Sequence, residues 1–124
     1  MGVVAINHIQ LPYLKPQAQA TRDFYARLLG LPDIAHPNSD RPRYVAGAQR
    51  IDLLPVDHLE RAGEPVHLAF EVTDLPQLRH ALLSAGLPLD ETRPLAGHRR
   101  FYVADPSGNR LEFLEPEPGG AFTV

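Results

Sequence analysis

The stretch Arg110–Leu114 (RLEFL) repeats, at an offset of 60 residues, the stretch Arg50–Leu54 (RIDLL). Asn7-His8-Ile9 is likewise echoed by Val66-His67-Leu68, at an offset of 59 residues. An internal repeat indicates that one structural unit occurs twice. Each copy carries a histidine and a carboxylate at matching places. The sequence therefore predicts a duplicated fold in which both halves contain candidate metal ligands.

The length of 124 residues suits one domain with its own core and is too short for two ordinary domains. We expect a single domain over 1–124. Within it we expect module one at 1–56, a charged linker at 57–64, module two at 65–115 and a loose tail at 116–124.

Composition excludes several classes of protein. Cysteine is absent, so disulfides, thiolate metal sites and cysteine nucleophiles are excluded. The net charge is −3 and the main basic group is Arg99-Arg100, which is too little for a nucleic-acid surface. No apolar run approaches the roughly 18 residues of a membrane helix, and no secretion signal is visible. We expect a cytoplasmic protein that acts on a small molecule, without nucleic acid or membrane partners.

The first half predicts the order β-α-β-β-β. Residues 3–11 form a branched, weakly alternating strand. A helix begins near Lys15-Pro16 and shows helical apolar spacing over 18–29, and Gly30 ends it. Three short strands follow, at 31–36, 44–46 and 50–55.

The second half predicts the same order. A strand at 65–72 precedes a helix that Thr73 or Asp74 caps and Gly86 ends. Strands follow at 87–92, 99–104 and 110–114, and the composition of 105–109 predicts a turn between the last two. The expected fold class is α+β, with two βαβββ modules that leave one sheet face free to form a cleft.

Strand alternation predicts where the polar residues point. His67 lies opposite the apolar face of its strand, and Glu112 and Asp52 alternate with core residues in theirs. The first strand is ambiguous, so we place His8 on the cleft face by analogy with His67. A single histidine or carboxylate on a strand is most often only solvated or hydrogen bonded. The shared face and the repeat favour metal binding by these four residues.

The chain resembles the vicinal oxygen chelate superfamily, which includes glyoxalase I, bleomycin-resistance proteins, fosfomycin-resistance enzymes and extradiol dioxygenases. The similarity covers nearly the whole chain and is strongest in the closing hairpin. The matching segments are Asn7-His8-Ile9, Phe24–Leu31, Val66–Phe70 and Phe101–Phe113. The resemblance implies paired βαβββ modules around an open, barrel-like cleft, and usually a homodimer whose halves are sometimes exchanged between subunits.

Carried over by position, the ligands that the resemblance implies are His8, His67 and Glu112. Glyoxalase I members add a glutamate where this chain has Asp52, which leaves three or four protein ligands open. Bleomycin-binding members usually lack these ligands. A set of imidazoles and carboxylates suits Fe²⁺, Mn²⁺, Ni²⁺, Co²⁺ or Zn²⁺, and the sequence does not choose among them.

Such a site would act on a substrate with two neighbouring oxygens. Glu112 is the candidate catalytic base, with Asp52 behind it. On the seventh expected strand, Arg100 would pair with a substrate carboxylate or phosphate, Tyr102 would donate a hydrogen bond, and His98 shares their face. Proton transfer of the lyase or isomerase type is favoured over dioxygenation of a catechol. The alternative is a protein that sequesters a ligand or antibiotic without turnover.

Overall fold

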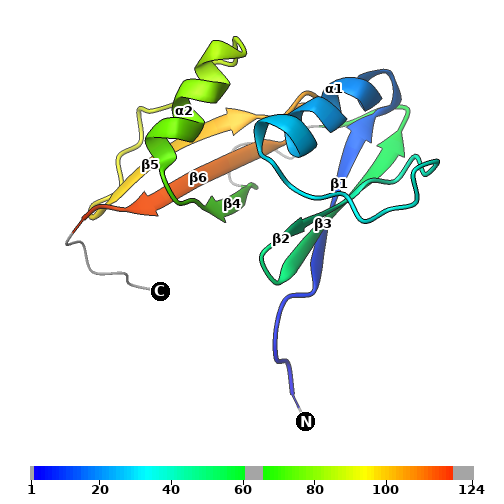
Figure 1. The fold of residues 1–124 in the computed structure, drawn as a ribbon, viewed down its shortest axis with the longest axis horizontal. Helices are drawn as coiled ribbons and strands as arrows, with labels where there is room; N and C mark the ends of the chain where they lie inside the picture. The colour runs from blue at the N-terminus through cyan, green and yellow to red at the C-terminus, as the bar shows by residue number, and fades with distance from the viewer. Residues whose placement is uncertain (1, 61–65, 119–124) are drawn as a thin grey trace. The chain divides into compact units, whose positions relative to one another are not determined.

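The computed structural model describes residues 2–60 and 66–118 and divides into two compact units, Met1–Glu60 and Arg61–Val124. The boundary falls inside 57–64, the segment predicted as a linker. Residues 61–65 of the linker region and 119–124 of the predicted tail lie outside the described residues. The predicted α+β class is confirmed, because each unit combines a small mixed sheet with a helical segment (Figure 1). No described helix is both long and apolar enough to cross a membrane.

The first unit contains a three-stranded sheet in the order β1-β3-β2. Strand β1 is parallel to β3, and β2 is antiparallel to it. The elements are β1 (His8–Leu14), η1 (Lys15–Gln17), α1 (Ala18–Arg22), η2 (Asp23–Leu28), β2 (Arg43–Ala46) and β3 (Gln49–Val56).

Aromatic packing holds the helical segment of the first unit on its sheet. Phe24 and Tyr25 are buried, and the Tyr25 ring stacks on that of Tyr44 with centroids 5.3 Å apart. Ile51 of β3 is also buried, and it is the cross-strand partner of Tyr44. The predicted helix over 18–29 is confirmed as consecutive helical turns, and the chain then leaves at Gly30 with a φ of +70°, which glycine adopts without strain.

The second unit also contains a three-stranded sheet, in the order β4-β6-β5, and α2 lies over one of its faces (Figure 1). Its elements are β4 (Leu68–Glu71), α2 (Leu75–Ser84), β5 (His98–Ala104) and β6 (Arg110–Pro116). The core consists of Leu82 from the helix and of Phe101, Leu111 and Phe113 from the sheet, all of them buried.

The start of α2 is attached to β6 by one carboxylate. Glu115 accepts hydrogen bonds from the backbone N–H groups of Asp74, at 2.6 Å, and Leu75, at 3.1 Å. Asp74 is the N-cap residue, as predicted, and its side chain accepts from the N–H of Gln77. The first-turn N–H groups, which lack partners within a helix, are thereby satisfied from the sheet.

A tight turn joins β5 to β6, as the composition predicted. The side chain of Asp105 accepts hydrogen bonds from the N–H groups of Ser107 and Asn109, and the Asn109 amide donates to it as well. Gly108 takes a φ of +90° within this turn. The hairpin is confirmed, and its rigid turn places Arg110 at the first position of β6.

Two predicted strands are shorter than expected. Residues 31–36 and 87–92 contribute only the isolated bridges Asp33–Tyr44 and Asp90–Tyr102. In both, the aspartate carboxylate accepts the backbone N–H of the residue two positions on, Ala35 or Thr92. This local hydrogen bond turns the chain away from the ladder after one bridge. Each unit therefore has one strand fewer than the predicted βαβββ order.

Two strand boundaries also differ from prediction. The strand predicted at 3–11 begins at His8, because its partner β3 begins only at Gln49 and the last bond runs from the Arg50 N–H to the Asn7 carbonyl. Within the described part of the strand predicted at 65–72, β4 covers Leu68–Glu71, and Val72 adds one backbone hydrogen bond to the Leu114 carbonyl of β6. His67 therefore lies directly before β4.

Candidate functional site

His8 and Asp52 form the histidine–carboxylate pair of the first unit. In the parallel register His8 lies opposite Arg50 and Gln10 opposite Asp52, so His8 and Asp52 share a face of the sheet. His8 Nε2 lies 3.9 Å from Asp52 Oδ2, with 44% and 19% of the two side chains exposed. His8 Nδ1 lies 2.8 Å from the amide oxygen of Asn7. Because that oxygen only accepts, the contact favours the tautomer with the proton on Nδ1, in which Nε2 is the acceptor.

Arginine side chains already occupy the carboxylate of Asp52. Arg50 donates through Nε to Oδ1, at 2.6 Å, and through Nη2 to Oδ2, at 2.9 Å. Arg43 Nε lies 3.7 Å from Oδ1. The hydrogen bond from Arg50 lowers the pKa of Asp52 below its usual value, and the Arg43 charge adds to this. Asp52 is therefore a carboxylate engaged on both oxygens.

His67 and Glu112 form the pair of the second unit, and their contact is closer. His67 Nε2 lies 3.0 Å from Glu112 Oε1, with 30% of the histidine side chain and 7% of the glutamate side chain exposed. Glu112 lies in the middle strand β6, opposite Ala69 of β4 and Tyr102 of β5. The middle strand thus carries a buried carboxylate that is in direct contact with a histidine.

Tyr102 packs against this pair. Its ring meets the His67 ring edge-on, with centroids 5.4 Å apart, and the Arg110 guanidinium lies 4.1 Å from the Tyr102 centroid. Burial and a hydrogen bond to Glu112 raise the pKa of the Tyr102 phenol. The phenol therefore stays protonated at neutral pH and acts as a donor.

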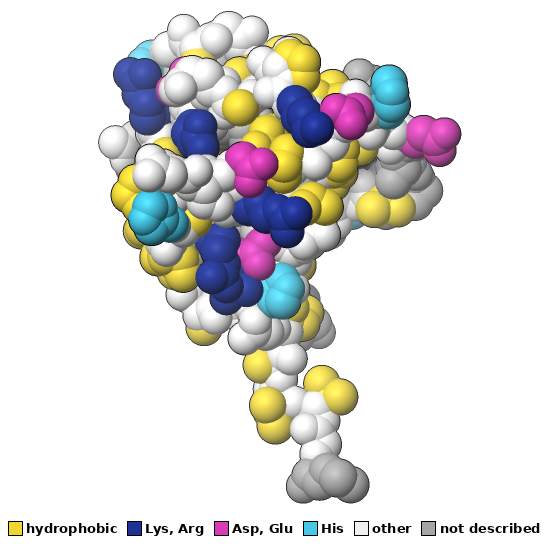
Figure 2. Space-filling view, turned by 90° about the vertical axis from the view of Figure 1, so that its right-hand side faces the viewer, with side chains coloured by type: hydrophobic (Ala, Val, Ile, Leu, Met, Phe, Trp, Pro, Cys, Tyr) yellow, Lys and Arg dark blue, Asp and Glu magenta, His cyan; other side chains and the backbone are white. Residues whose placement is uncertain are grey.

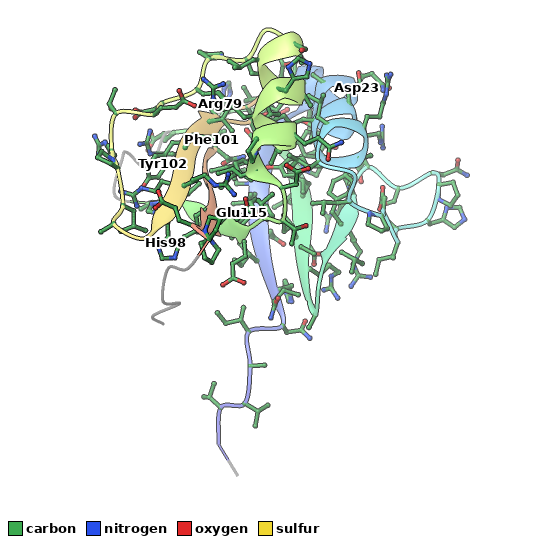
Figure 3. All side chains as sticks on the ribbon, turned by 60° about the vertical axis from the view of Figure 1, so that its left-hand side comes forward. Asp23, Arg79, His98, Phe101, Tyr102 and Glu115 are labelled. Atoms are coloured by element: carbon green, nitrogen blue, oxygen red, sulfur yellow. The ribbon has the colours of Figure 1, made fainter. Side chains whose placement is uncertain are left out.

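Arg100 and His98 share the face of Tyr102, as predicted. Their partners in β6 are Leu114 and Pro116, which lie on the same face of the strand as Glu112. Figure 3 shows His98 and Tyr102 on β5. Arg100 Nη1 lies 3.6 Å from Glu112 Oε2, and its Nε donates to the carbonyl of Arg93 at 2.7 Å. His98 Nδ1 lies 3.2 Å from the Ala96 carbonyl. Arg100 is therefore adjacent to the pair, while His98 lies farther along the strand.

Four residues that the sequence analysis did not assign lie around these pairs, two of them in contact with Asp52 and two in contact with Tyr102 beside the second pair. In the first unit they are Arg43 and Arg50. In the second they are Arg110 and its ion-pair partner Asp90, whose carboxylate lies 3.4 Å from Arg110 Nη2. Arg50 and Arg110 stand two positions before the acid in both copies of the repeat, so alternation along a strand could have placed them on the same face.

The donors fit a divalent metal by their chemistry. Each unit brings one imidazole nitrogen within 4 Å of one carboxylate oxygen, and no sulfur competes because cysteine is absent. Such donors suit the divalent first-row ions named above. Within residues 2–60 and 66–118, no group of three or more metal-binding side chains is gathered closely enough to form a complete site. Each unit alone therefore brings together two candidate ligands.

The fold, two small mixed sheets each with a helical segment, is that of the vicinal oxygen chelate class. A family model described as a glyoxalase-like domain matches residues 13–114. The chain therefore belongs to the glyoxalase-like domain family, within the superfamily that its closing hairpin resembles. No curated protein matches it at a significant level.

Solved structures show the same fold. A protein described as a glyoxalase family member from Bacillus anthracis is 26% identical, with a TM-score of 0.82, covering 94% of this chain and 98% of that one. A lactoylglutathione lyase from Agrobacterium tumefaciens is 18% identical, with a TM-score of 0.71 and coverages of 93% and 96%. A fosfomycin resistance protein from Listeria monocytogenes is 17% identical, with a TM-score of 0.75 and coverages of 90% and 91%.

Proposed function

We propose that this protein is a divalent-metal-dependent enzyme that acts on a small substrate with two neighbouring oxygens, by proton transfer of the lyase or isomerase type. The observation that carries the proposal is the buried Glu112 carboxylate, 3.0 Å from His67 and packed against Tyr102. Membership of the glyoxalase-like family supports it. Proton transfer is favoured over dioxygenation because a carboxylate and a phenol donor lie together.

The proposed ligands are His8, His67, Glu112 and Asp52, for an ion that is Fe²⁺, Mn²⁺, Ni²⁺, Co²⁺ or Zn²⁺. Nε2 of His8 is available as a ligand because Nδ1 is engaged by Asn7. Asp52 is the weakest member of the set, because Arg50 occupies both of its oxygens. When bound, the ion supplies positive charge that stabilises negative charge on neighbouring substrate oxygens.

The remaining roles belong to the chain's own side chains. Glu112 accepts the proton that the substrate loses, because its carboxylate lies 3.0 Å from the proposed ligand His67 and therefore close to a bound substrate. The Tyr102 phenol donates a hydrogen bond to the substrate. Arg100 pairs with a substrate carboxylate or phosphate, because its guanidinium lies beside Glu112 at the same face. His98 extends this binding surface along β5.

Metal binding tests the proposal directly. Untagged protein is stripped with chelator, reloaded with each ion in turn and analysed for bound metal after dialysis. We expect one tightly bound divalent ion per chain, lost in His67→Ala and in Glu112→Gln. His80→Ala, an exposed histidine of α2, is the matched control and should bind metal as the wild type does. A wild-type protein that retains no stoichiometric ion after reloading would refute the proposal.

One observation favours the alternative of ligand sequestration without turnover. The carboxylate of Asp52 is already neutralised by Arg50, which leaves the first unit with a single unengaged donor in His8. Under this alternative, His8→Ala and Glu112→Ala leave the affinity for a bound antibiotic or metabolite nearly unchanged. A screen of hemithioacetals, catechols and fosfomycin with thiols, with and without metal, separates turnover from binding.

The proposal includes a homodimer in the cytoplasm. Support for the dimer comes from the segment before β1, where Val3, Val4 and Ile6 are 99%, 95% and 65% exposed (Figure 2). Apolar side chains exposed next to a sheet edge favour association with a second copy. Light scattering at micromolar concentration should give twice the mass of the chain. A monomer would contradict this part of the proposal.

A further inference from the structure

The two units differ in what their matched arginines contact. Arg50 and Arg110 each stand two positions before the carboxylate, on the same face of the middle strand. The residue paired with the carboxylate across the antiparallel ladder is different. Arg43 pairs with Asp52, whereas Tyr102 pairs with Glu112. The same arginine position therefore has a cationic neighbour in one unit and an aromatic neighbour in the other.

In the first unit the arginine binds the acid. Arg50 donates hydrogen bonds to both oxygens of Asp52, at 2.6 and 2.9 Å. This bidentate geometry makes arginine–carboxylate pairs strong. No ring stands opposite Asp52 to attract the guanidinium, because the residue there is Arg43. The carboxylate of this unit is therefore held by its own strand neighbour.

In the second unit the arginine contacts a ring and a different carboxylate. The Arg110 guanidinium lies 4.1 Å from the centroid of the Tyr102 ring, and its Nη2 lies 3.4 Å from Asp90 Oδ2. Asp90 is itself fixed, because its backbone exchanges two hydrogen bonds with that of Tyr102 and its carboxylate accepts from Thr92. Ring and carboxylate together form a seat for a planar cation.

We propose that Tyr102 and Asp90 direct Arg110 to this seat, instead of into a fork on Glu112, and so keep the Glu112 carboxylate available to bind metal. Both are then positioning residues that act through Arg110. The part of the inference that concerns metal rests on the proposed function, whereas the part that concerns Arg110 does not.

Cobalt affinity, measured by calorimetry and by the visible spectrum of the bound ion, tests the role of the ring. Tyr102→Leu should weaken Co²⁺ binding by roughly 10–100-fold, the usual cost of losing a residue that supports a metal ligand. Tyr102→Phe keeps the ring and removes only the hydrogen bond to Glu112, so it should lose clearly less affinity than Tyr102→Leu, and the difference between the two variants measures the part played by the ring. A loss in Tyr102→Phe equal to that in Tyr102→Leu would overturn the proposal.

A second substitution tests whether Arg110 is the cause. Tyr102→Leu combined with Arg110→Gln should recover to within about threefold of wild type, because the two changes are coupled through one contact. Arg99→Gln is the matched control. Arg99 belongs to β5, the strand of Tyr102, but pairs with Glu115, so its loss should leave the Co²⁺ affinity unchanged. A double variant as weak as Tyr102→Leu would overturn the proposal.

The crystal structure of the metal-free Tyr102→Leu protein gives an independent answer. We expect the Arg110 guanidinium within hydrogen-bond distance of both Glu112 oxygens, as Arg50 is of Asp52. If Tyr102→Leu does not fold, Asp90→Asn removes the other half of the seat and serves the same purpose. An Arg110 that keeps its place in these variants would overturn the inference. If the wild-type protein binds no metal but Arg110 binds both Glu112 oxygens in the Tyr102→Leu structure, the proposed function is refuted and the inference about Arg110 stands.

Discussion

The first and second units carry the same three kinds of side chain at matched positions, yet they use them differently. In the first, Asp52 is held by Arg50, and His8 stands 3.9 Å from it on a half-exposed surface. In the second, Glu112 is buried and 3.0 Å from His67, while Arg110 stacks on Tyr102. The comparison teaches that matched carboxylates of a repeat can have different partners, and that the residue across the ladder, Arg43 or Tyr102, differs with them.

Glu112→Gln should cause the largest change. It removes the buried charge that we propose as ligand and base, so divalent-metal affinity should fall by more than about 100-fold, beyond the roughly 10–100-fold typical of residues that only support a ligand. Calorimetric titration with Co²⁺ or Ni²⁺ measures this. Unchanged affinity in a folded protein would mean that the two units do not differ as we describe.

Asp52→Asn should cost much less. Because Arg50 already occupies both oxygens of Asp52, the loss of metal affinity should be at most about tenfold, which is about 1.4 kcal/mol. The same titration applies, with the matched variant Arg50→Gln as control. A loss as large as that in Glu112→Gln would make Asp52 a full fourth ligand and remove the contrast between the units.

Glu115 should make the second unit more sensitive to acid than the first. Hydrogen bonds from Leu75 and Asp74, together with the Arg99 charge, lower the pKa of Glu115. Its contribution to the stability of the folded protein is therefore complete above its ordinary pKa and is lost as the pH falls through the lowered value. The helical segments of the first unit have no side-chain cap of this kind.

Glu115→Gln should therefore lower the melting temperature at pH 7 by roughly 3–6 °C and flatten the acid side of the stability profile. Thermal unfolding followed by circular dichroism between pH 2 and 7 measures both effects. A variant with the same acid profile as wild type would show that the attachment of α2 to β6 adds nothing to stability.

Tyr44→Phe should give the smallest effect and the opposite sign. The Tyr44 hydroxyl is fully buried and has no hydrogen-bond partner among the described residues, so its removal should raise the free energy of unfolding by about 1 kcal/mol. Burial also raises the pKa of Tyr44 to about 12. Wild-type stability should thus decline as the pH rises from 10 to 12, and less so in the variant. Urea titrations at pH 7 and pH 11 test both points.

Periodicity and turn composition predicted most of the architecture. The hairpin of β5 and β6 was predictable because two stretches rich in aromatic and aliphatic residues flank a turn rich in Asp, Ser, Gly and Asn. The strands at 31–36 and 87–92 were overpredicted, since the side chains of Asp33 and Asp90 capture a backbone N–H group and end the pairing. Propensity does not reveal such a local competitor.

For the candidate site, strand alternation placed Asp52 and Glu112 opposite the apolar neighbours of their strands, and those neighbours are buried, whereas His67 lies just before β4. It did not reveal that Asp52 has an arginine on both oxygens. That outcome depends on which side chain stands across the ladder, Arg43 or Tyr102, and the pairing register is a long-range property. The convergence of the two pairs on one ion stays a prediction.

The attachment of α2 to Glu115 has a consequence for how the chain is made. The helix receives its N-terminal partner from a residue about forty positions later in the chain. A ribosome that has just completed α2 has therefore not yet synthesised the carboxylate that secures its first turn. The second half of the molecule matures only after its last strand has emerged, whereas the first half is complete in sequence by the end of β3.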